Sequence, residues 1–386
     1  MTVVAAARVV AGTVVHAPGW VSHEHGVITG IGAGRPDRPD DDLGDAILVP
    51  GFVDIHVHGG GGGAFTTRDP ASALRAVDTH RRHGTTTTMA SLVTASPADL
   101  LASVSMLAEL YRDGVVAGVH LEGPWISPLR CGAHDRRQLR DPSAAEIDRL
   151  LTAADGAVAM VTIAPELTGA PEAIRRFTDA GVVAAVGHTD CSFSVADAAI
   201  EAGARVATHL FNAMRPIHHR DPGPIVALLD DPRVTVELIA DGIHLDPALY
   251  RHVSRTVGSD RVALVTDAMA AAGLGDGGYR LGAMAVDVRD GVARIAGADT
   301  IAGSTTTMDQ LFRNAVGGPP TDGPTDAALL HAVRQTATNP ARVLGRTDIG
   351  ALEPGRRADV VVLDADLHVT GVIVGGDQPV SSVNAP

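Results

Sequence analysis

Two histidines separated by one valine, His56 and His58, stand directly before five consecutive glycines, Gly59 to Gly63. Because successive side chains of a strand point to opposite faces, both imidazoles can lie on one side and reach one cation. The glycines allow a second interpretation, a backbone cradle for phosphate. However, they lack the spaced GxGxxG pattern and the lysine of a phosphate-binding loop. The pattern therefore favours a metal site.

More side chains that can bind a metal or transfer a proton stand at the ends of later β-rich runs. Glu122 ends the third run, His188 the fifth, His209 the sixth and Asp267 the eighth. A single strand-end histidine is more often a packing residue, but chance does not concentrate such groups at the same end of successive runs. Nitrogen and oxygen ligands that leave one position open for water suit a catalytic divalent metal. Asp267 could then act as general base on the metal-bound water, even if it also caps a helix.

These groups need a scaffold that brings distant strand ends together. Between residues 47 and 270, β-rich runs alternate with segments of helical period, which predicts repeated βα units. The predicted strands are Ile47 to His58, Thr85 to Val93, Val115 to Glu122, Val158 to Pro165, Val182 to His188, Arg205 to Leu210, Val234 to Ala240 and Arg261 to Asp267. We therefore expect an α/β fold, a TIM-like (β/α)8 barrel with its active site at the C-terminal ends of the strands.

The two ends of the chain do not fit the barrel pattern. Residues 1–48 and 350–386 contain short strands interrupted by Gly and Pro, which predicts a small β-sandwich domain built from both termini. The catalytic barrel would then comprise residues 49–349. After the eighth strand, the segment from Tyr279 to Gly297 predicts a hairpin that turns at Arg289-Asp290-Gly291 and overhangs the barrel mouth.

Composition limits the partners and the compartment. Lys and Arg number 31 against 45 Asp and Glu, a formal net charge of −14, which argues against nucleic acid and anionic membranes as partners. Two cysteines, Cys131 and Cys191, are too few for a disulfide framework and favour the cytoplasm. We interpret Cys131 as an idle free thiol. The apolar N-terminal run contains Arg8, which favours strands over a signal peptide, and no uncharged apolar stretch is long enough for a membrane span.

Six short motifs lie in the barrel region in a recognisable order: HLEGPW (120–125), GHTD (187–190), HLFNAM (209–214), ADGIH (240–244), VTDAM (265–269) and IAGS (301–304). With the HxH pair and the tail LEPGRRADVVVLD (352–364), they resemble the amidohydrolase superfamily and, within it, the family of N-acetylglucosamine-6-phosphate deacetylases. The resemblance implies hydrolysis of N-acetylglucosamine 6-phosphate to glucosamine 6-phosphate and acetate, by an enzyme of cytoplasmic amino sugar metabolism.

The resemblance also implies a role for individual residues. Glu122, His188 and His209 would hold the catalytic metal, and Asp267 would take the water proton and return it to the leaving amine. The implied substrate-binding residues are Ala133 and His134 near the sugar or carbonyl oxygen, Asn212, Ala213 and Arg220 at the phosphate, Asp241 and His244, and Ile301, Ala302 and Gly303 over the sugar. A homodimer with a shared phosphate site is implied as well.

Some deacetylases of this family lack the HxH pair and work with one metal, whereas this chain keeps His56 and His58. We therefore predict two metals per subunit, bridged by Glu122, because the fourth strand offers no lysine. The ligand set leaves zinc, iron, manganese and cobalt open. Two other functions remain open: an amidohydrolase acting on a different N-acyl or cyclic amide, and a non-catalytic, metal-stabilised sensor of sugar phosphates.

Overall fold

The computed structural model describes residues 1–317, 323–377 and 380–381. Its backbone divides into two compact units. One comprises Met1–Asp54, His80–Thr87 and Thr307–Pro386, and the other Ile55–Thr79 and Thr88–Thr306. Part of the predicted C-terminal β segment, residues 378–379 and 382–386, lies outside the described residues. The domain boundaries placed at residues 48/49 and 349/350 stay a prediction.

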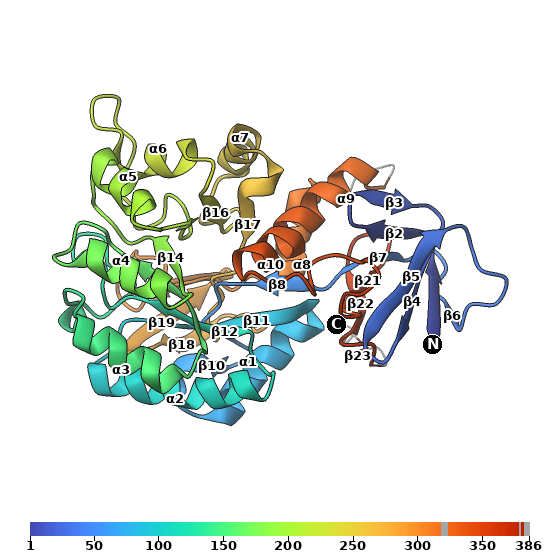
Figure 1. The fold of residues 1–386 in the computed structure, drawn as a ribbon, viewed down its shortest axis with the longest axis horizontal. Coiled ribbons are helices and arrows are strands. Elements are labelled where there is room, and N and C mark those ends of the chain that lie inside the picture. Colours follow the sequence, from blue (N-terminus) through green and yellow to red (C-terminus); the bar gives the residue numbers. More distant parts are fainter. Residues whose placement is uncertain (318–322, 378–379, 382–386) are drawn as a thin grey trace. The chain divides into compact units, whose positions relative to one another are not determined.

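Eight strands form one sheet in which each strand lies beside its neighbour in sequence, as a (β/α)8 barrel requires (Figure 1). They are β8 (Phe52–Asp54), β11 (Thr85–Leu92), β12 (Gly118–Glu122), β13 (Val158–Ile163), β14 (Val183–Val186), β15 (Val206–Ala207), β16 (Thr235–Leu238) and β17 (Val262–Leu264). All pairs from β11 to β17 are parallel. The predicted TIM-like barrel is confirmed, with strands shorter than expected.

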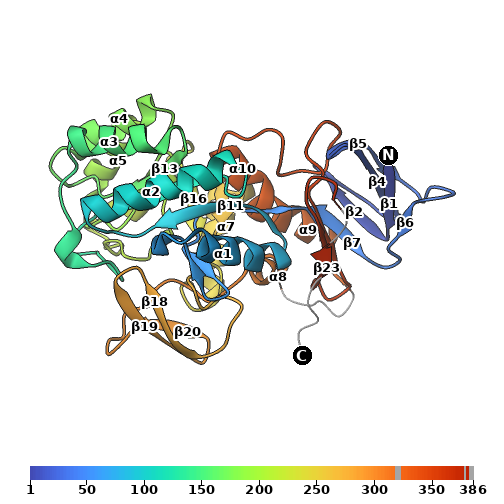
Figure 2. The same ribbon diagram turned by 90° about the horizontal axis from the view of Figure 1, so that it is seen from below.

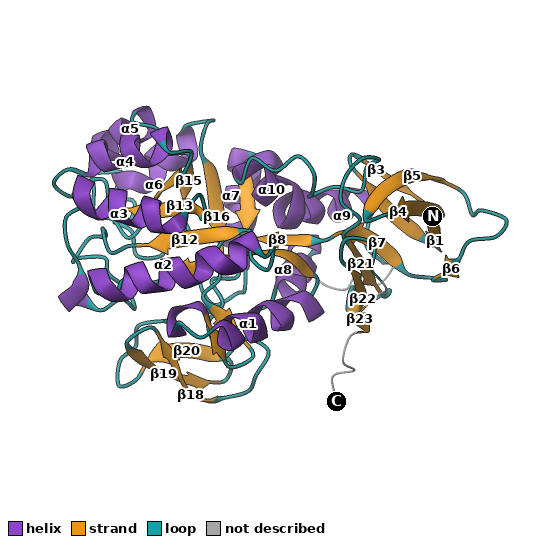
Figure 3. Cartoon of the chain, turned by 60° about the horizontal axis from the view of Figure 1, so that its bottom comes forward, coloured by secondary structure: helices purple, strands orange, loops and turns teal. Residues whose placement is uncertain are grey.

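A helix follows most of these strands, and Figure 3 shows the alternation. The helices are α1 (Pro70–Arg82), α2 (Pro97–Arg112), α3 (Ala144–Ala154), α4 (Ala170–Asp179), α5 (Phe193–Glu201), α6 (Gly223–Asp230) and α7 (Pro247–Val257), with 3-10 turns at Phe65–Thr67, Arg136–Gln138 and Ser259–Arg261. Ser96, Ser143 and Ser192 cap α2, α3 and α5 through their hydroxyls. Ser96 is therefore a true N-cap of α2, with Pro97 in the first turn.

The predicted first strand, Ile47 to His58, is wrong as a single element. It is divided at Gly51 into β7 (Ile47–Pro50) and β8, which belong to different sheets. A Cβ atom on Gly51 would lie 2.1 Å from the hydroxyl of Thr86, so only glycine fits where the chain passes from β7 to β8. His56 and His58 consequently follow β8 instead of ending it.

The terminal unit contains two sheets, ordered β5-β4-β1-β6 and β23-β22-β21-β7-β2-β3. The strands are β1 (Thr2–Ala6), β2 (Arg8–Ala11), β3 (Val14–His16), β4 (Gly19–Glu24), β5 (Val27–Ala33), β6 (Asp41–Asp42), β21 (Val360–Leu363), β22 (Val369–Ile373) and β23 (Val380–Ser381). Figure 2 shows blue N-terminal and red C-terminal strands side by side. Val21 and Ile28 of one sheet share a buried core with Leu48 and Val360 of the other. The β-sandwich built from both termini is confirmed.

Three further helices belong to the same compact unit: α8 (Met308–Val316), α9 (Asp326–Val333) and α10 (Asn339–Val343), with a π-helical turn at Arg334–Thr338. Phe312 of α8 packs on Phe52, with ring centroids 5.3 Å apart. Within the described residues, no helix is both long enough and apolar enough to cross a membrane.

The hairpin predicted after the eighth strand is a sheet of three strands, β18 (Gly277–Leu281), β19 (Met284–Arg289) and β20 (Val292–Ile295). The predicted turn is present, with positive φ at Asp290 and Gly291. A second turn, at Gly282, was not predicted and adds the third strand. The sheet shares a buried cluster with Val93 and Ala133.

The glycine run forms a tight turn between β9 (Gly59–Gly60) and β10 (Gly63–Ala64). Gly61 and Gly62 both have positive φ, and a Cβ atom on Gly63 would lie 2.2 Å from the carbonyl oxygen of Ser72. The amides of Gly59, Gly61 and Gly62 donate to backbone carbonyls. They are therefore not available to a phosphate.

Candidate active site

A cavity with a volume of about 440 Å³ opens among the loops that follow the barrel strands. It is lined by predicted site residues from distant parts of the chain: His58, Glu122, Ala133, His134, His188, His209, Asn212, Ala213, His244, Asp267, Ile301 and Gly303. His56 is fully buried beside these residues, 3.4 Å from Glu122. The structure therefore brings together all six residues predicted to bind metal or transfer a proton.

His56 and His58 follow β8 directly, on a segment that lies between the ends of strands β11 and β17. The amide of Ser91, near the end of β11, donates to the carbonyl of Val57, and the amide of Asp267, after β17, donates to the carbonyl of His56. Val57 also forms a parallel bridge with Ala268. This segment thus joins the first and last strand ends, which places the HxH pair next to Asp267.

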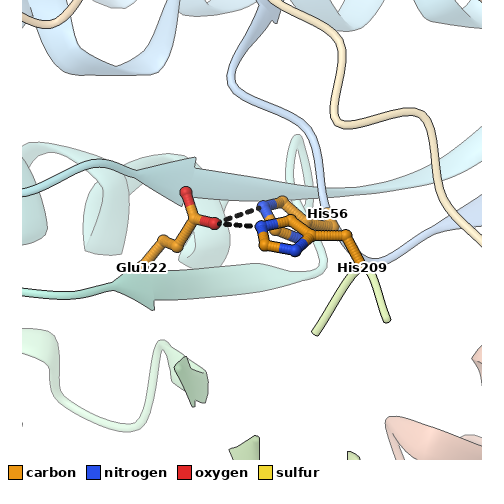
Figure 4. A group of neighbouring side chains, drawn as sticks. All are labelled: His56, Glu122 and His209. Atoms are coloured by element: carbon orange, nitrogen blue, oxygen red, sulfur yellow. Dashed lines mark hydrogen bonds and ion pairs between the residues drawn. The ribbon is translucent and has the colours of Figure 1, made fainter. Parts of the chain in front are cut away.

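The Glu122 carboxylate is the centre of the site, and Figure 4 shows it beside His56 and His209. Its Oε1 atom lies 3.0 Å from Nε2 of His188 and 2.9 Å from Nε2 of His209. Its Oε2 atom lies 3.2 Å from Nε2 of His58. One carboxylate therefore contacts histidines from both halves of the predicted ligand set, the arrangement that a bridging ligand requires.

Asp267 completes the group. Its Oδ1 atom lies 3.1 Å from Nε2 of His58 and 3.5 Å from Nε2 of His56. Burial raises the pKa of Asp267. The neighbouring imidazoles, His56 first, lower it by more than burial raises it, so the net pKa lies below the usual range. The carboxylate is therefore ionised and can accept a proton.

Hydrogen bonds on the far side of the rings set which nitrogen faces the centre. Nδ1 of His58 lies 3.2 Å from the carbonyl oxygen of Ser91, and Nδ1 of His188 lies 2.8 Å from that of Arg130. A carbonyl oxygen only accepts, so each Nδ1 must carry a hydrogen. In a neutral ring the lone pair is then on Nε2, facing Glu122, which is the orientation of a metal-ligating histidine.

The facing nitrogens are too close to be left without a positive charge. Nε2 of His56 and Nε2 of His58 are 3.3 Å apart, and those of His188 and His209 are 3.2 Å apart. Two lone pairs at this distance repel each other unless a proton or a cation lies between them. Nitrogen and carboxylate donors of this kind suit a divalent metal, and the groups His56-Glu122-His209 and His56-His58-Asp267 have the spacing of ligands.

The pKa values reflect the same need for positive charge. Burial lowers the pKa of His58, but hydrogen bonds to Asp267 and Glu122 outweigh burial and raise it to about 9. Burial likewise lowers the pKa of His56, and the charges of Glu122 and Asp267 raise it well above the usual value. Without a metal, the two rings hold protons that a metal must displace.

His134 differs from the other histidines of the cavity. Its Nδ1 accepts the backbone N–H of Thr94 at 3.2 Å and lies 2.9 Å from the Thr94 hydroxyl. A backbone N–H only donates, so Nδ1 holds the lone pair and the neutral ring carries its hydrogen on Nε2, 3.3 Å from Glu122. Burial is the main cause that lowers the pKa of His134 to about 4. His134 therefore offers the cavity a neutral hydrogen-bond donor.

Three site residues have strained backbones where the chain leaves a barrel strand. His188, His209 and Asp267 have φ angles of 47°, 26° and 47°. Non-glycine residues rarely adopt this left-handed conformation, and such strain is concentrated at functional sites. The strain turns each side chain from the end of its strand into the cavity.

Some predicted substrate residues do not reach this cavity. Arg220 is exposed in the loop 215–222, and its guanidinium lies 2.7 Å from Nε2 of His219. Ala302 is buried in the core of the three-stranded sheet. Asp241 supports another residue, because its carboxylate lies 2.8 Å from Nδ1 of His244, which itself lines the cavity.

Three residues that contact site residues or line the cavity were not predicted from the sequence. Thr94 orients His134, and Glu237 contacts His56. Arg130 lines the cavity, and its guanidinium donates to Asp190 at 2.8 Å. No local pattern distinguishes these side chains from surface or strand residues. The predicted idle thiol, Cys131, does not line the cavity.

The fold and this cluster define a class of hydrolase. The chain belongs to the amidohydrolase family, whose model matches residues 47–378. Within it, the chain is similar over most of its length to N-acetylglucosamine-6-phosphate deacetylases, which confirms the resemblance predicted from the motifs. A Bos taurus protein of that name is 38% identical, over 87% of this chain and 84% of the relative. An N-acetylgalactosamine-6-phosphate deacetylase of Escherichia coli O157:H7 is 36% identical, over 86% and 87%.

A solved structure gives the same relationship. The D267A mutant of the N-acetyl-D-glucosamine-6-phosphate deacetylase from Mycobacterium smegmatis, in complex with N-acetyl-D-glucosamine-6-phosphate, matches with a TM-score of 0.94 and 55% identity, over 97% of this chain and 98% of that chain.

Proposed function

We propose that the chain is a metal-dependent deacetylase that hydrolyses N-acetylglucosamine 6-phosphate to glucosamine 6-phosphate and acetate. The observation that carries this proposal is the convergence of histidine Nε2 atoms on Glu122 and Asp267 inside one cavity. The similarity to deacetylases of this substrate supports the choice of reaction. We further propose a cytoplasmic enzyme, with domains formed by residues 1–48 plus 350–386 and by residues 49–349.

We propose two divalent ions per subunit, of zinc, iron, manganese or cobalt. Glu122, His188 and His209 would hold one, and His56 and His58 the other, with Glu122 shared between them. A bound divalent cation lowers the pKa of a water molecule and polarises a carbonyl oxygen. The fourth barrel strand, β13, contains no lysine that could bridge two ions, so a bridge by Glu122 fits the chain better.

The remaining steps depend on side chains of this chain. The Asp267 carboxylate would accept the proton of the attacking water and then donate it to the amine nitrogen as the C–N bond breaks. Nε2–H of His134 would donate to the carbonyl oxygen as that oxygen gains negative charge. His244, held by Asp241, would contact the sugar. Burial lowers the pKa of His244, but its hydrogen bond to Asp241 gives a net rise.

We propose that the phosphate site is completed across a homodimer. Asn212 and Ala213 line the cavity, whereas Arg220 of the same chain does not. Large apolar side chains are exposed on neighbouring mouth loops, Leu129 at 74% and Ile217 at 52%, a feature of surfaces that bind another chain. In a two-fold dimer, each subunit could supply Arg220 to the other, and a guanidinium suits a phosphate because it makes paired hydrogen bonds.

Replacing Arg220 by Ala is expected to raise KM for N-acetylglucosamine 6-phosphate by about 10- to 100-fold, the loss of one charge-assisted contact, with little change in kcat. Arg251→Ala, on the exposed side of α7, is the matched control. Mixing Arg220→Ala subunits with inactive Asp267→Asn subunits should restore part of the activity if the arginine acts across the dimer. An unchanged KM for Arg220→Ala would show that the phosphate assignment is wrong.

Acetate release from a series of substrates tests the proposed specificity. We expect N-acetylglucosamine 6-phosphate to have a kcat/KM at least about 100-fold above that of N-acetylglucosamine, because unphosphorylated sugar leaves the phosphate donors unpaired. N-acetylgalactosamine 6-phosphate is the second candidate substrate, since one relative carries that name. Equal rates with and without phosphate would instead favour an amidohydrolase for another N-acyl substrate.

A further inference from the structure

We infer that Glu237 is a positioning residue for the metal site, which it serves by holding the ring of His56. Glu237 lies on β16 and is fully buried, and it does not line the cavity. A role in direct contact with substrate is thereby excluded. The inference rests on the metal site proposed above.

Two contacts join Glu237 to the site. Its Oε2 atom lies 3.1 Å from Nδ1 of His56 and accepts the backbone N–H of His209 at 3.2 Å. Its Oε1 atom has no hydrogen-bond partner among the described residues. A carboxylate buried this completely is costly to remove from water unless it is paired. The pairing that offsets the cost is the one with His56.

An ionised carboxylate only accepts hydrogen bonds, so Nδ1 of His56 must carry a hydrogen. The lone pair of the neutral ring is then on Nε2, which lies 3.4 Å from Glu122 and 3.5 Å from Asp267. The same carboxylate fixes the backbone of His209, at the end of another strand, in its left-handed conformation. Glu237 thus sets both the tautomer of one predicted ligand and the position of another.

Glu237 differs from the other supports of the predicted ligands. The far sides of His58 and His188 meet neutral backbone carbonyls, whereas the far side of His56 meets a carboxylate. A carboxylate partner raises the basicity of a metal-bound imidazole, and loss of such a partner weakens metal affinity by about 10- to 100-fold. The effect should be largest for the ion that His56 binds.

Zinc affinity of metal-free protein, measured by competition with a chromophoric chelator, tests the inference. We expect Glu237→Gln to weaken one of two zinc sites by about 10-fold, because an amide oxygen can still accept from Nδ1, and Glu237→Leu to weaken it by about 100-fold. Thr85→Val, another change of a buried polar strand residue, should bind zinc as the wild type does. Thermal unfolding without metal separates lost affinity from lost folding.

Zinc affinities equal to wild type in folded Glu237→Gln and Glu237→Leu proteins would overturn the inference alone. If these variants do not fold, nitrogen NMR of zinc-loaded wild type with ¹⁵N-histidine decides: the inference requires His56 to be protonated at Nδ1 and metal-bound at Nε2, and the reverse would overturn it. Absence of zinc binding by wild type would overturn the metal site as well. Zinc binding that depends on Glu237, without acetate release from any substrate, would overturn only the proposed reaction.

Discussion

Replacing Asp267 by Asn is expected to lower kcat for acetate release by about 10²- to 10⁴-fold, the usual contribution of a general acid or base. The amide has nearly the same shape, but it cannot take a proton from water or return one to the amine. Because the His and Glu side chains around it are unchanged, the protein should still fold and bind substrate. Steady-state kinetics and substrate titration by calorimetry measure the two effects separately.

Asp246→Asn is a matched control for this variant. Asp246 caps helix α7 through its carboxylate, and Asn caps a helix equally well. The same loss of charge at Asp246 should leave kcat unchanged. If Asp267→Asn binds substrate and releases acetate at the wild-type rate, Asp267 is not the general base and the non-catalytic sensor becomes the better explanation.

Replacing His188 by Ala is expected to remove the ion that we propose for Glu122, His188 and His209, and with it nearly all turnover. The loss of a direct ligand should weaken affinity for that ion by more than about 100-fold, because even an outer partner of a ligand contributes up to that much. Metal analysis after gel filtration should find at least one ion fewer per subunit than in the wild type.

His252→Ala is the control, since His252 is exposed on α7 and does not line the cavity. Wild-type metal content and activity in His188→Ala would contradict the assignment of this residue. A saturated wild-type protein with a single ion per subunit would contradict the second metal site formed by His56 and His58.

The sequence predicted the barrel and most of its site because both depend on local patterns. The end of the strand in each βα repeat can be predicted from the local sequence. Glu122, His188, His209 and Asp267 stand at or just beyond such ends. Parallel strands in sequence order place these ends at one mouth. The terminal sandwich was predictable for the same reason, since its strands alternate with Gly and Pro.

What the sequence did not predict depends on contacts between distant residues. β propensity predicts one strand from Ile47 to His58. It cannot show that the chain packs against Thr86 at Gly51 and passes there from one sheet to another. Glu237 resembles any polar residue in a strand until its carboxylate is seen beside His56. The position of Arg220 outside the cavity is equally invisible in the sequence, because it depends on how its loop folds.

The sequence also does not show which ring nitrogen of a histidine carries the hydrogen. His134 and His188 are both histidines of cavity-lining loops, yet the first meets a backbone N–H and the second a backbone carbonyl. The first therefore offers a hydrogen to the cavity, and the second offers a lone pair. Only the fold decides which nitrogen of each histidine faces the cavity.

Hydrolysis of N-acetylglucosamine 6-phosphate is expected to depend on the metal that we propose for this cluster. The most direct test measures acetate release by metal-free protein before and after stepwise addition of zinc, manganese or cobalt. We predict no turnover without metal and recovery that follows occupancy of the cluster, with one amine formed for each acetate. Acetate release at the full rate by protein shown to contain no metal would show that the reaction does not need a metal.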